Sequence, residues 1–192
     1  MQRDAIREAA KLAGFESIEM LEEPVAAAMG YMAQNGSKDQ GILVYDLGGG
    51  TFDLAYVHKD DKDEFYCPLP PSGDPKCGGD DFDQLIYQYW EEHAQGEFSC
   101  GLCPQGDISQ AVLHQCRKSK EGLSDYPKAT ATLFLNNRPR RMLLERDQFE
   151  NLIRSVVNST LELTRGLISQ IEQDNLPLDS IVMIGGSTRV PL

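Results

Sequence analysis

The sequence predicts an α/β protein, and three stretches of its 192 residues carry that prediction. Residues 42–47 and 52–57 are apolar runs of strand length separated by Gly48-Gly49-Gly50-Thr51, so they form two strands joined by a short turn. Residues 146–173 carry apolar side chains at helical spacing, which predicts one long amphipathic helix. The apolar run 181–184 adds a buried strand that leads into a glycine-rich segment.

The residues before the first long strand predict two helices and a short strand. Apolar side chains recur on one face of residues 4–13, and Gly14 provides a C-terminal stop. Residues 17–21 form a short strand in this interpretation. Pro24 suits the first turn of a second helix, and the small side chains of residues 25–32 allow that helix to pack closely.

The centre of the chain predicts a change of organisation. After the charged turn 58–64, residues 65–67 form a third strand and residues 68–75 are irregular. A helix opens at Gly78-Gly79-Asp80-Asp81, where two carboxylates suit the positive end of the helix dipole. A second helix covers residues 108–122.

A strand pair precedes the long helix. Residues 129–135 read as a strand, residues 140–144 as a return strand, and Asn136-Asn137 as the turn between them. The chain shows no internal repeat of solenoid length.

The charge balance excludes some classes of partner. A formal net charge of −12, from 30 acidic and 18 basic side chains, argues against nucleic acid or an anionic membrane as the main partner. No apolar run approaches the roughly 20 residues that span a bilayer, and the first residues read as a charged amphipathic helix, not a signal peptide. We therefore expect a soluble, cytoplasmic protein.

The five cysteines are odd in number and irregularly spaced, which fits reduced thiols better than a disulfide framework. Cys100 and Cys103 could form half of a zinc site or a redox pair, with His93 and His114 nearby in sequence. No second ligand pair at matching spacing is present, so plain thiols in a surface loop are the favoured interpretation. Cys116 is expected to be a packed helix residue.

The turn between the first two strands predicts a phosphate-binding hairpin. Glycines let backbone N–H groups approach a polyanion, and Asp46 and Asp53 at either end can hold its Mg²⁺ through water. A nucleoside triphosphate is the expected ligand. The glycines could instead form an ordinary bulged turn. The motif is not a Walker loop, because no Gly-Lys-Ser/Thr follows and the glycines lead into a strand.

Several separated motifs together resemble the ATPase domain of the seventy-kilodalton heat-shock chaperones (DnaK-like), within the actin-like ATPase superfamily. The resemblance spans nearly the whole chain and depends on the order and spacing of the motifs. They are Gln2-Arg3, residues 23–28 with Gly30-Tyr31, residues 46–53, residues 78–83, Lys120 with Leu123-Ser124, and residues 185–191.

The resemblance implies an actin-like ATPase (ribonuclease H-like) lobe with a mixed sheet and helices, plus an inserted smaller α+β subdomain. Residues 1–76 would hold the linking helices and the first part of the lobe, residues 77–152 the insertion, and residues 153–192 the return to the lobe. The chain resembles the second of two lobes only. The first lobe, with another phosphate hairpin and a lysine, would lie outside it, so we expect the chain alone not to hydrolyse ATP.

The resemblance also assigns catalytic and metal-binding roles. Glu23 would position or deprotonate the attacking water, although a capping acid before Pro24 is the simpler interpretation of that residue alone. Asp46 would bind Mg²⁺ through water, and Asp53 and Asp81 would hold an ion or water, with K⁺ as a further candidate cation. Thr51 joins Glu23 and Asp46 as a catalytic candidate.

The nucleotide-binding residues implied by the resemblance come from four segments. The turn and the glycines of the next helix would contact phosphates, and the later residues would contact adenosine. An ordinary N-cap is the alternative for Gly78 and Gly79. A structural turn explains Gly185 and Gly186 equally well, but not the whole motif 185–189. The residues are Gly48, Gly49, Gly50, Thr51, Gly78, Gly79, Lys120, Ser124, Gly185, Gly186, Ser187 and Arg189.

Arg117 and Glu121 depart from the family, which usually has an acidic residue and then an arginine at these positions. They are four apart on one helix face and could pair with each other. Glu121 cannot stack on adenine as an arginine does, so altered nucleotide affinity or exchange is expected.

The parent protein would be an ATP-driven chaperone that works with client peptides, a J-domain co-chaperone and a nucleotide exchange factor. An actin-like filament ATPase and a degenerate, non-hydrolysing nucleotide-binding module are the alternatives.

Overall fold

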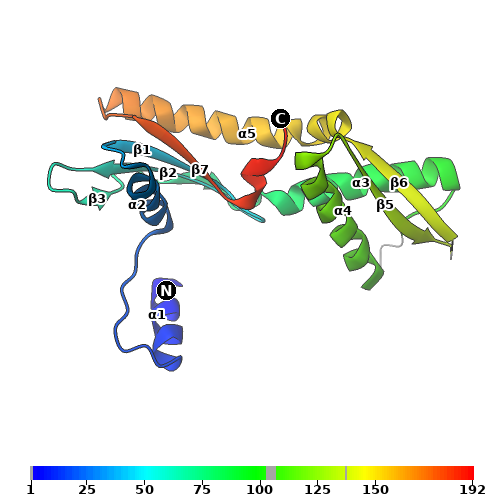
Figure 1. Ribbon diagram of the computed structural model, residues 1–192, viewed down its shortest axis with the longest axis horizontal. Coiled ribbons are helices and arrows are strands. Elements are labelled where there is room, and N and C mark those ends of the chain that lie inside the picture. Colours follow the sequence, from blue (N-terminus) through cyan, green and yellow to red (C-terminus); the bar gives the residue numbers. More distant parts are fainter. Residues whose placement is uncertain (1, 103–106, 137) are drawn as a thin grey trace.

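A computed structural model describes residues 2–102, 107–136 and 138–192 (Figure 1). The described residues form five α-helices, one short 3₁₀ helix and seven strands. The elements in chain order are α1 (Gln2–Leu12), α2 (Glu23–Asn35), β1 (Gly41–Leu47), β2 (Phe52–Lys59), β3 (Phe65–Tyr66), β4 (Ser72–Asp74), α3 (Gly79–Phe98), α4 (Asp107–Asp125), β5 (Lys128–Leu135), β6 (Arg138–Glu145), α5 (Arg146–Gln173), β7 (Ser180–Ile184) and η1 (Gly186–Arg189).

The main sheet is mixed, which confirms the predicted fold class. Its strands follow the order β3-β2-β1-β7, and β4 pairs separately with β2. Strands β1 and β2 are antiparallel, whereas β1 and β7 are parallel. The long connection through α3, α4, β5, β6 and α5 separates β2 from β7 in sequence, yet β7 returns to lie beside β1 (Figure 1).

Strand β1 is apolar on both faces because helices cover both sides of the sheet. Leu43 and Tyr45 pack in the cluster that includes Ile153 and Leu167 of α5. Ile42 and Val44, which point the other way, pack in the cluster that includes Val25 and Met32 of α2. A strand buried on both faces reads as a continuous apolar run, which is why the sequence identified it.

A second, two-stranded sheet of β5 and β6 lies at the opposite end of the molecule with α3 and α4 (Figure 1). Trp90 of α3 is fully buried, and Phe82 of α3 meets Phe149 of α5 edge to face, with ring centroids 6.5 Å apart. Helix α5 begins beside this sheet and runs along the main sheet, so it joins the two ends (Figure 1).

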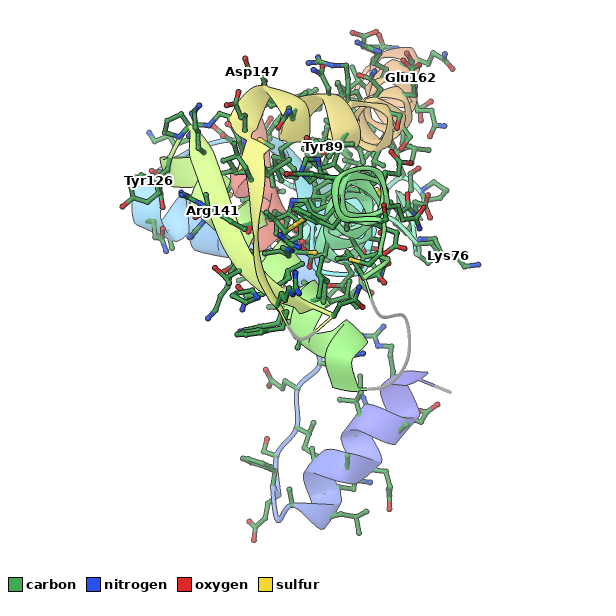
Figure 2. The ribbon with its side chains drawn as sticks, turned by 90° about the vertical axis from the view of Figure 1, so that its right-hand side faces the viewer. Lys76, Tyr89, Tyr126, Arg141, Asp147 and Glu162 are labelled. Carbon is green, nitrogen blue, oxygen red and sulfur yellow. The ribbon has the colours of Figure 1, made fainter. Side chains whose placement is uncertain are left out.

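Helix α1 stands apart from the other elements in both views (Figures 1 and 2). Its apolar side chains are exposed, with Leu12 at 82% and Ile6 at 55%. The strand predicted for residues 17–21 is wrong, since this segment has no regular structure. Among the described strands none pairs with it, and a strand needs a neighbour to satisfy its backbone.

Two further predictions from the sequence need correction. Residues 68–75 were expected to be irregular because of their prolines, but β4 forms there as a three-residue strand at the side of β2. The apolar pattern predicted for residues 146–173 includes Leu161, which is 38% exposed on α5. Thr160 is buried instead, since its hydroxyl lies 2.7 Å from that of Tyr45 on β1.

Candidate functional site

The turn between β1 and β2 presents free backbone donors. Asp46 and Asp53 are register partners at its base, and the N–H of Gly48 donates to the carbonyl of Thr51 at 2.9 Å to close the turn. Gly49, Gly50 and Thr51 are exposed. Within the described part of the chain, no acceptor takes the N–H of Gly49 or Gly50. The tip therefore offers two amides to an anion.

The same turn is fixed against the start of α3. The N–H groups of Gly79 and Asp80 donate to the carbonyls of Gly48 and Gly49 at 3.0 and 2.6 Å. A Cβ on Gly78 would lie 2.5 Å from the carbonyl oxygen of Gly49, so only glycine permits this approach. The N–H of Gly78 donates to the Asp81 carboxylate at 2.8 Å. The amides of Gly78 and Gly79 are therefore already bonded within the protein, in contrast to those of Gly49 and Gly50.

A third segment, residues 185–189, meets the turn at Gly48. Gly185 has φ +87°, and a Cβ there would overlap the carbonyl of Leu47. The buried hydroxyl of Ser187 donates to the carbonyl of Gly48 at 2.8 Å. The structure therefore brings the turn, the start of α3 and the Ser187 segment together, whereas Arg189 is exposed.

Helix α4 reaches the same junction through Lys120. Its buried ammonium group donates to the carbonyl of Gly79 at 2.6 Å and lies 2.8 Å from the carboxylate of Asp83. Burial raises the pKa of Asp83, and the hydrogen bonds and charges of Lys120 and Arg117 act in the opposite direction. Lys120 was predicted to bind nucleotide, and here it also holds α4 to the first turn of α3.

Arg117 pairs with α3, not with Glu121. Its Nη2 lies 2.6 Å from Asp80, and its Nε lies 3.4 Å from Asp83. The hydrogen bond to Asp80 is the largest cause of the raised pKa of Arg117. The helical pair with Glu121 that the spacing allowed is therefore replaced by two contacts between helices.

These segments surround a hollow of about 270 Å³, which we call the smaller hollow. One wall comes from the turn and the start of α3, another from α4, and the third from η1. Its lining includes Gly49, Gly79, Lys120, Glu121, Ser124 and Ser187. Ser124, which the resemblance assigns to adenosine, lines this hollow together with Gly186.

A larger hollow of about 910 Å³ lies at the base of the hairpin and is lined by the carboxylates of Glu23, Asp46 and Asp53. Burial is the main cause of the raised pKa of Asp46, and the negative charges of Glu23 and Asp53 add to it. Asp81 does not join them: it lines a separate hollow with Asp74 and Ser155.

The donor set of the larger hollow suits a hydrated cation. Magnesium commonly binds one or two carboxylates and keeps several waters. Among the described residues, no group of three or more His, Cys, Asp or Glu is placed to hold a metal ion directly. The two carboxylates Asp46 and Asp53 thus have the chemistry to hold a cation through water, and water-mediated Mg²⁺ binding stays a prediction.

Asp83 is a site residue that the sequence reasoning did not single out. It belongs to the motif 78–83, but no role was assigned to it. The available signal was its position on α3 beside Phe82 and Ile86, on the face that packs into the core. A carboxylate on such a face needs a cationic partner, and Lys120 is that partner.

The cysteines and the membrane prediction can also be compared with the structure. Cys100 is a half-buried free thiol and Cys116 a buried one, whereas Cys103 lies outside the described residues. Across the part of the chain that the structure describes, no helix combines the length and the apolar character needed to cross a membrane.

The comparison with protein families gives a single description. A family model described as "Hsp70 protein" matches residues 1–192. The match covers the hairpin, the start of α3, the α4 residues and the Ser187 segment that meet in the structure. The chain therefore belongs to the Hsp70 family and carries sequence of its chaperone ATPase nucleotide-binding domain.

Proposed function

We propose that this chain is the second lobe of an Hsp70 nucleotide-binding domain and that it binds the phosphates and adenosine of ATP and ADP together with Mg²⁺. The observation that carries the proposal is the pair of free N–H groups on Gly49 and Gly50, at the point where three segments meet. Amides converging at a turn are a common way to bind phosphate. The division into residues 1–76, 77–152 and 153–192 is part of the proposal.

In this proposal the tip of the hairpin binds the phosphates, and its base binds the cation. The tip, with Gly49 and Gly50, receives the phosphates, and the exposed hydroxyl of Thr51 is available to the same oxygens. Bound Mg²⁺ would neutralise charge on the phosphates. Asp46 and Asp53 would hold it through water, with K⁺ as a second candidate cation near Asp81. Glu23, across the larger hollow, would orient the attacking water.

The nucleoside would occupy the smaller hollow beside the tip. Lys120 and Ser187 hold its walls together, and Gly186 and Ser124 face it. Hydrolysis would require the other lobe of the domain, so the chain alone is proposed to bind nucleotide without turnover. In the parent protein, client peptides, a J-domain co-chaperone and a nucleotide exchange factor would be its partners.

The test is an NMR titration of the 192-residue chain with Mg·ADP at millimolar concentrations, since one face of a site binds weakly. We expect shifts of the Gly49 and Gly50 amides with ADP and with pyrophosphate, and smaller ones with adenosine. Amides of β5 and β6 serve as the internal control. Unchanged Gly49 and Gly50 signals at saturating ADP would exclude the proposed function.

A non-hydrolysing nucleotide-binding module is a second candidate, favoured by one observation: Glu121, not an arginine, lines the smaller hollow. A steady-state ATPase assay on the parent protein, with and without Glu23→Ala, separates the two candidates. Turnover that falls strongly in the variant supports the chaperone ATPase. Nucleotide binding without turnover in both proteins supports the module.

A further inference from the structure

Two of the cationic side chains of α4, those of Arg117 and Lys120, are committed to α3. Arg117 contacts Asp80 and Asp83, and the ammonium group of Lys120 contacts Asp83 and the carbonyl of Gly79. Two of the three protons of Lys120 are thereby directed into the protein. The side chains that α4 has left for the smaller hollow are those of Glu121 and Ser124.

The carboxylate of Glu121 can accept hydrogen bonds but has no cationic partner in the smaller hollow among the described residues. It is exposed, it lines the smaller hollow, and within the described ranges no cationic side chain pairs with it. Two other polar side chains of the hollow already have partners: Asp80 binds Arg117, and the hydroxyl of Ser187 donates to Gly48. The Glu121 carboxylate is therefore free to accept hydrogen bonds from solvent or from a ligand.

Resting on the proposed function, we propose that Glu121 is a specificity-determining residue whose carboxylate accepts a hydrogen bond from an O–H or N–H donor of the bound nucleoside. Two sources share this chemistry. Carboxylates bind ribose hydroxyls in dinucleotide sites, and they accept hydrogen bonds from the amino groups of bases. The hollow would therefore select its nucleoside by donors and not by stacking.

The direction in which nucleotide affinity changes when Glu121 is removed shows whether its carboxylate contacts the nucleoside. ADP is a polyanion, so a nearby carboxylate that makes no contact only repels it, and its removal would tighten binding of every nucleotide. A carboxylate that accepts a hydrogen bond from the nucleoside does the opposite. Hydrogen bonds to charged groups are among the stronger ones, so removal of Glu121 would weaken binding.

The experiment compares the wild-type chain with Glu121→Ala and Glu121→Gln by the same NMR titration, using ADP, GDP, 2′-deoxyADP and 3′-deoxyADP. Alanine is a good helix former, so the variants are expected to fold. Glu172→Ala, at an exposed position on α5, is the matched control. We expect Glu121→Ala to bind ADP or GDP about tenfold more weakly, and Glu121→Gln to fall between it and the wild type.

The deoxynucleotides identify the donor. If a ribose hydroxyl donates, the wild type binds one deoxyADP about as weakly as Glu121→Ala binds ADP, and the variant no longer distinguishes the two. If the base donates, Glu121→Ala weakens all nucleotides carrying that base alike. Unchanged or tighter binding of all four nucleotides by Glu121→Ala overturns the inference, whereas a wild-type chain that binds none of them overturns the proposed function as well.

Discussion

The carboxylates on the two sides of the hairpin differ in how their charge is compensated. At the junction with α3 and α4, Asp80 and Asp83 pair with Arg117 and Lys120. In the larger hollow, Glu23, Asp46 and Asp53 face one another, and no cationic side chain of the described residues forms an ion pair with any of them.

The paired carboxylates stabilise the fold, whereas the unpaired ones do not. Asp83 is buried and would be very unfavourable without its partner, so its pair with Lys120 holds two helices together. In the larger hollow, burial raises the pKa of Asp46, and the negative charges of Glu23 and Asp53 add to it. Perturbed carboxylates that line a hollow are more frequent at functional sites than elsewhere. Variants that change either group of carboxylates should alter the unfolding free energy, and the expected changes differ in size.

Loss of the compensating charge at the junction has the largest expected effect. Lys120→Met keeps the length of the side chain and leaves Asp83 with only the longer contact to Arg117, so we expect a loss of about 3 kcal/mol in unfolding free energy. Urea unfolding measures it. The matched control is Lys128→Met, which breaks the exposed pair with Glu145 and should change stability by about 0–1 kcal/mol.

A double variant sharpens this result. Lys120→Met with Asp83→Leu removes both charges, and it should recover part of the lost stability, because a buried pair can often be replaced by apolar side chains. If Lys120→Met alone costs no more than the Lys128 control, the junction is not held by this pair, and the contrast between the two sides of the hairpin disappears.

The close approach at Gly78 gives the next effect. Its φ of −172° is extended, so alanine fits the backbone, but its Cβ would meet the carbonyl of Gly49 and the N–H of Gly50. We expect Gly78→Ala to cost about 2 kcal/mol and to shift the Gly49 and Gly50 amides without ligand. Gly122→Ala, on an open face of α4, should be neutral or stabilising. Unmoved turn signals in Gly78→Ala would show that the turn is not fixed by α3.

The elements around the site were readable from sequence because their patterns are local. The apolar runs of β1 and β2 and the helical periodicity of the 28-residue α5 each lie in one continuous segment. The strand predicted at 17–21 failed, since pairing depends on a neighbour that local sequence does not reveal. The resemblance named the residues at the hairpin, but not how their hydrogen bonds are used.

The partner of Arg117 shows the limit most clearly. Spacing along α4 offered Glu121, one turn away. The structure gives Arg117 to Asp80 and Asp83, which lie on another helix and are 37 and 34 positions earlier in sequence. Such a choice depends on how α3 and α4 pack, and periodicity within one helix contains no information on it.

The uncompensated carboxylates give the smallest effect, with the opposite sign. The pKa of Asp46 is raised from its ordinary value of 3.8, so the folded chain binds its proton more tightly than the unfolded chain does. The ionised Asp46 carboxylate therefore destabilises the folded chain, and this cost is largest once the pH exceeds the folded-state pKa. Asp46→Asn should therefore stabilise the chain at pH 7, by less than about 1 kcal/mol because the group is partly exposed, while weakening Mg·ADP binding.

The pH dependence tests the cause. Below 3.8 Asp46 is protonated in both states, so the wild type and Asp46→Asn should have similar stability, and the advantage of the variant should grow as the pH rises through the raised pKa. Urea unfolding of both proteins from pH 3 to pH 7 measures the difference, and other titrating groups largely cancel in it. Added Mg²⁺ should narrow the gap by stabilising only the wild type. A variant that is less stable at pH 7 would mean that Asp46 has a structural partner, and the two sides of the hairpin would then follow the same rule.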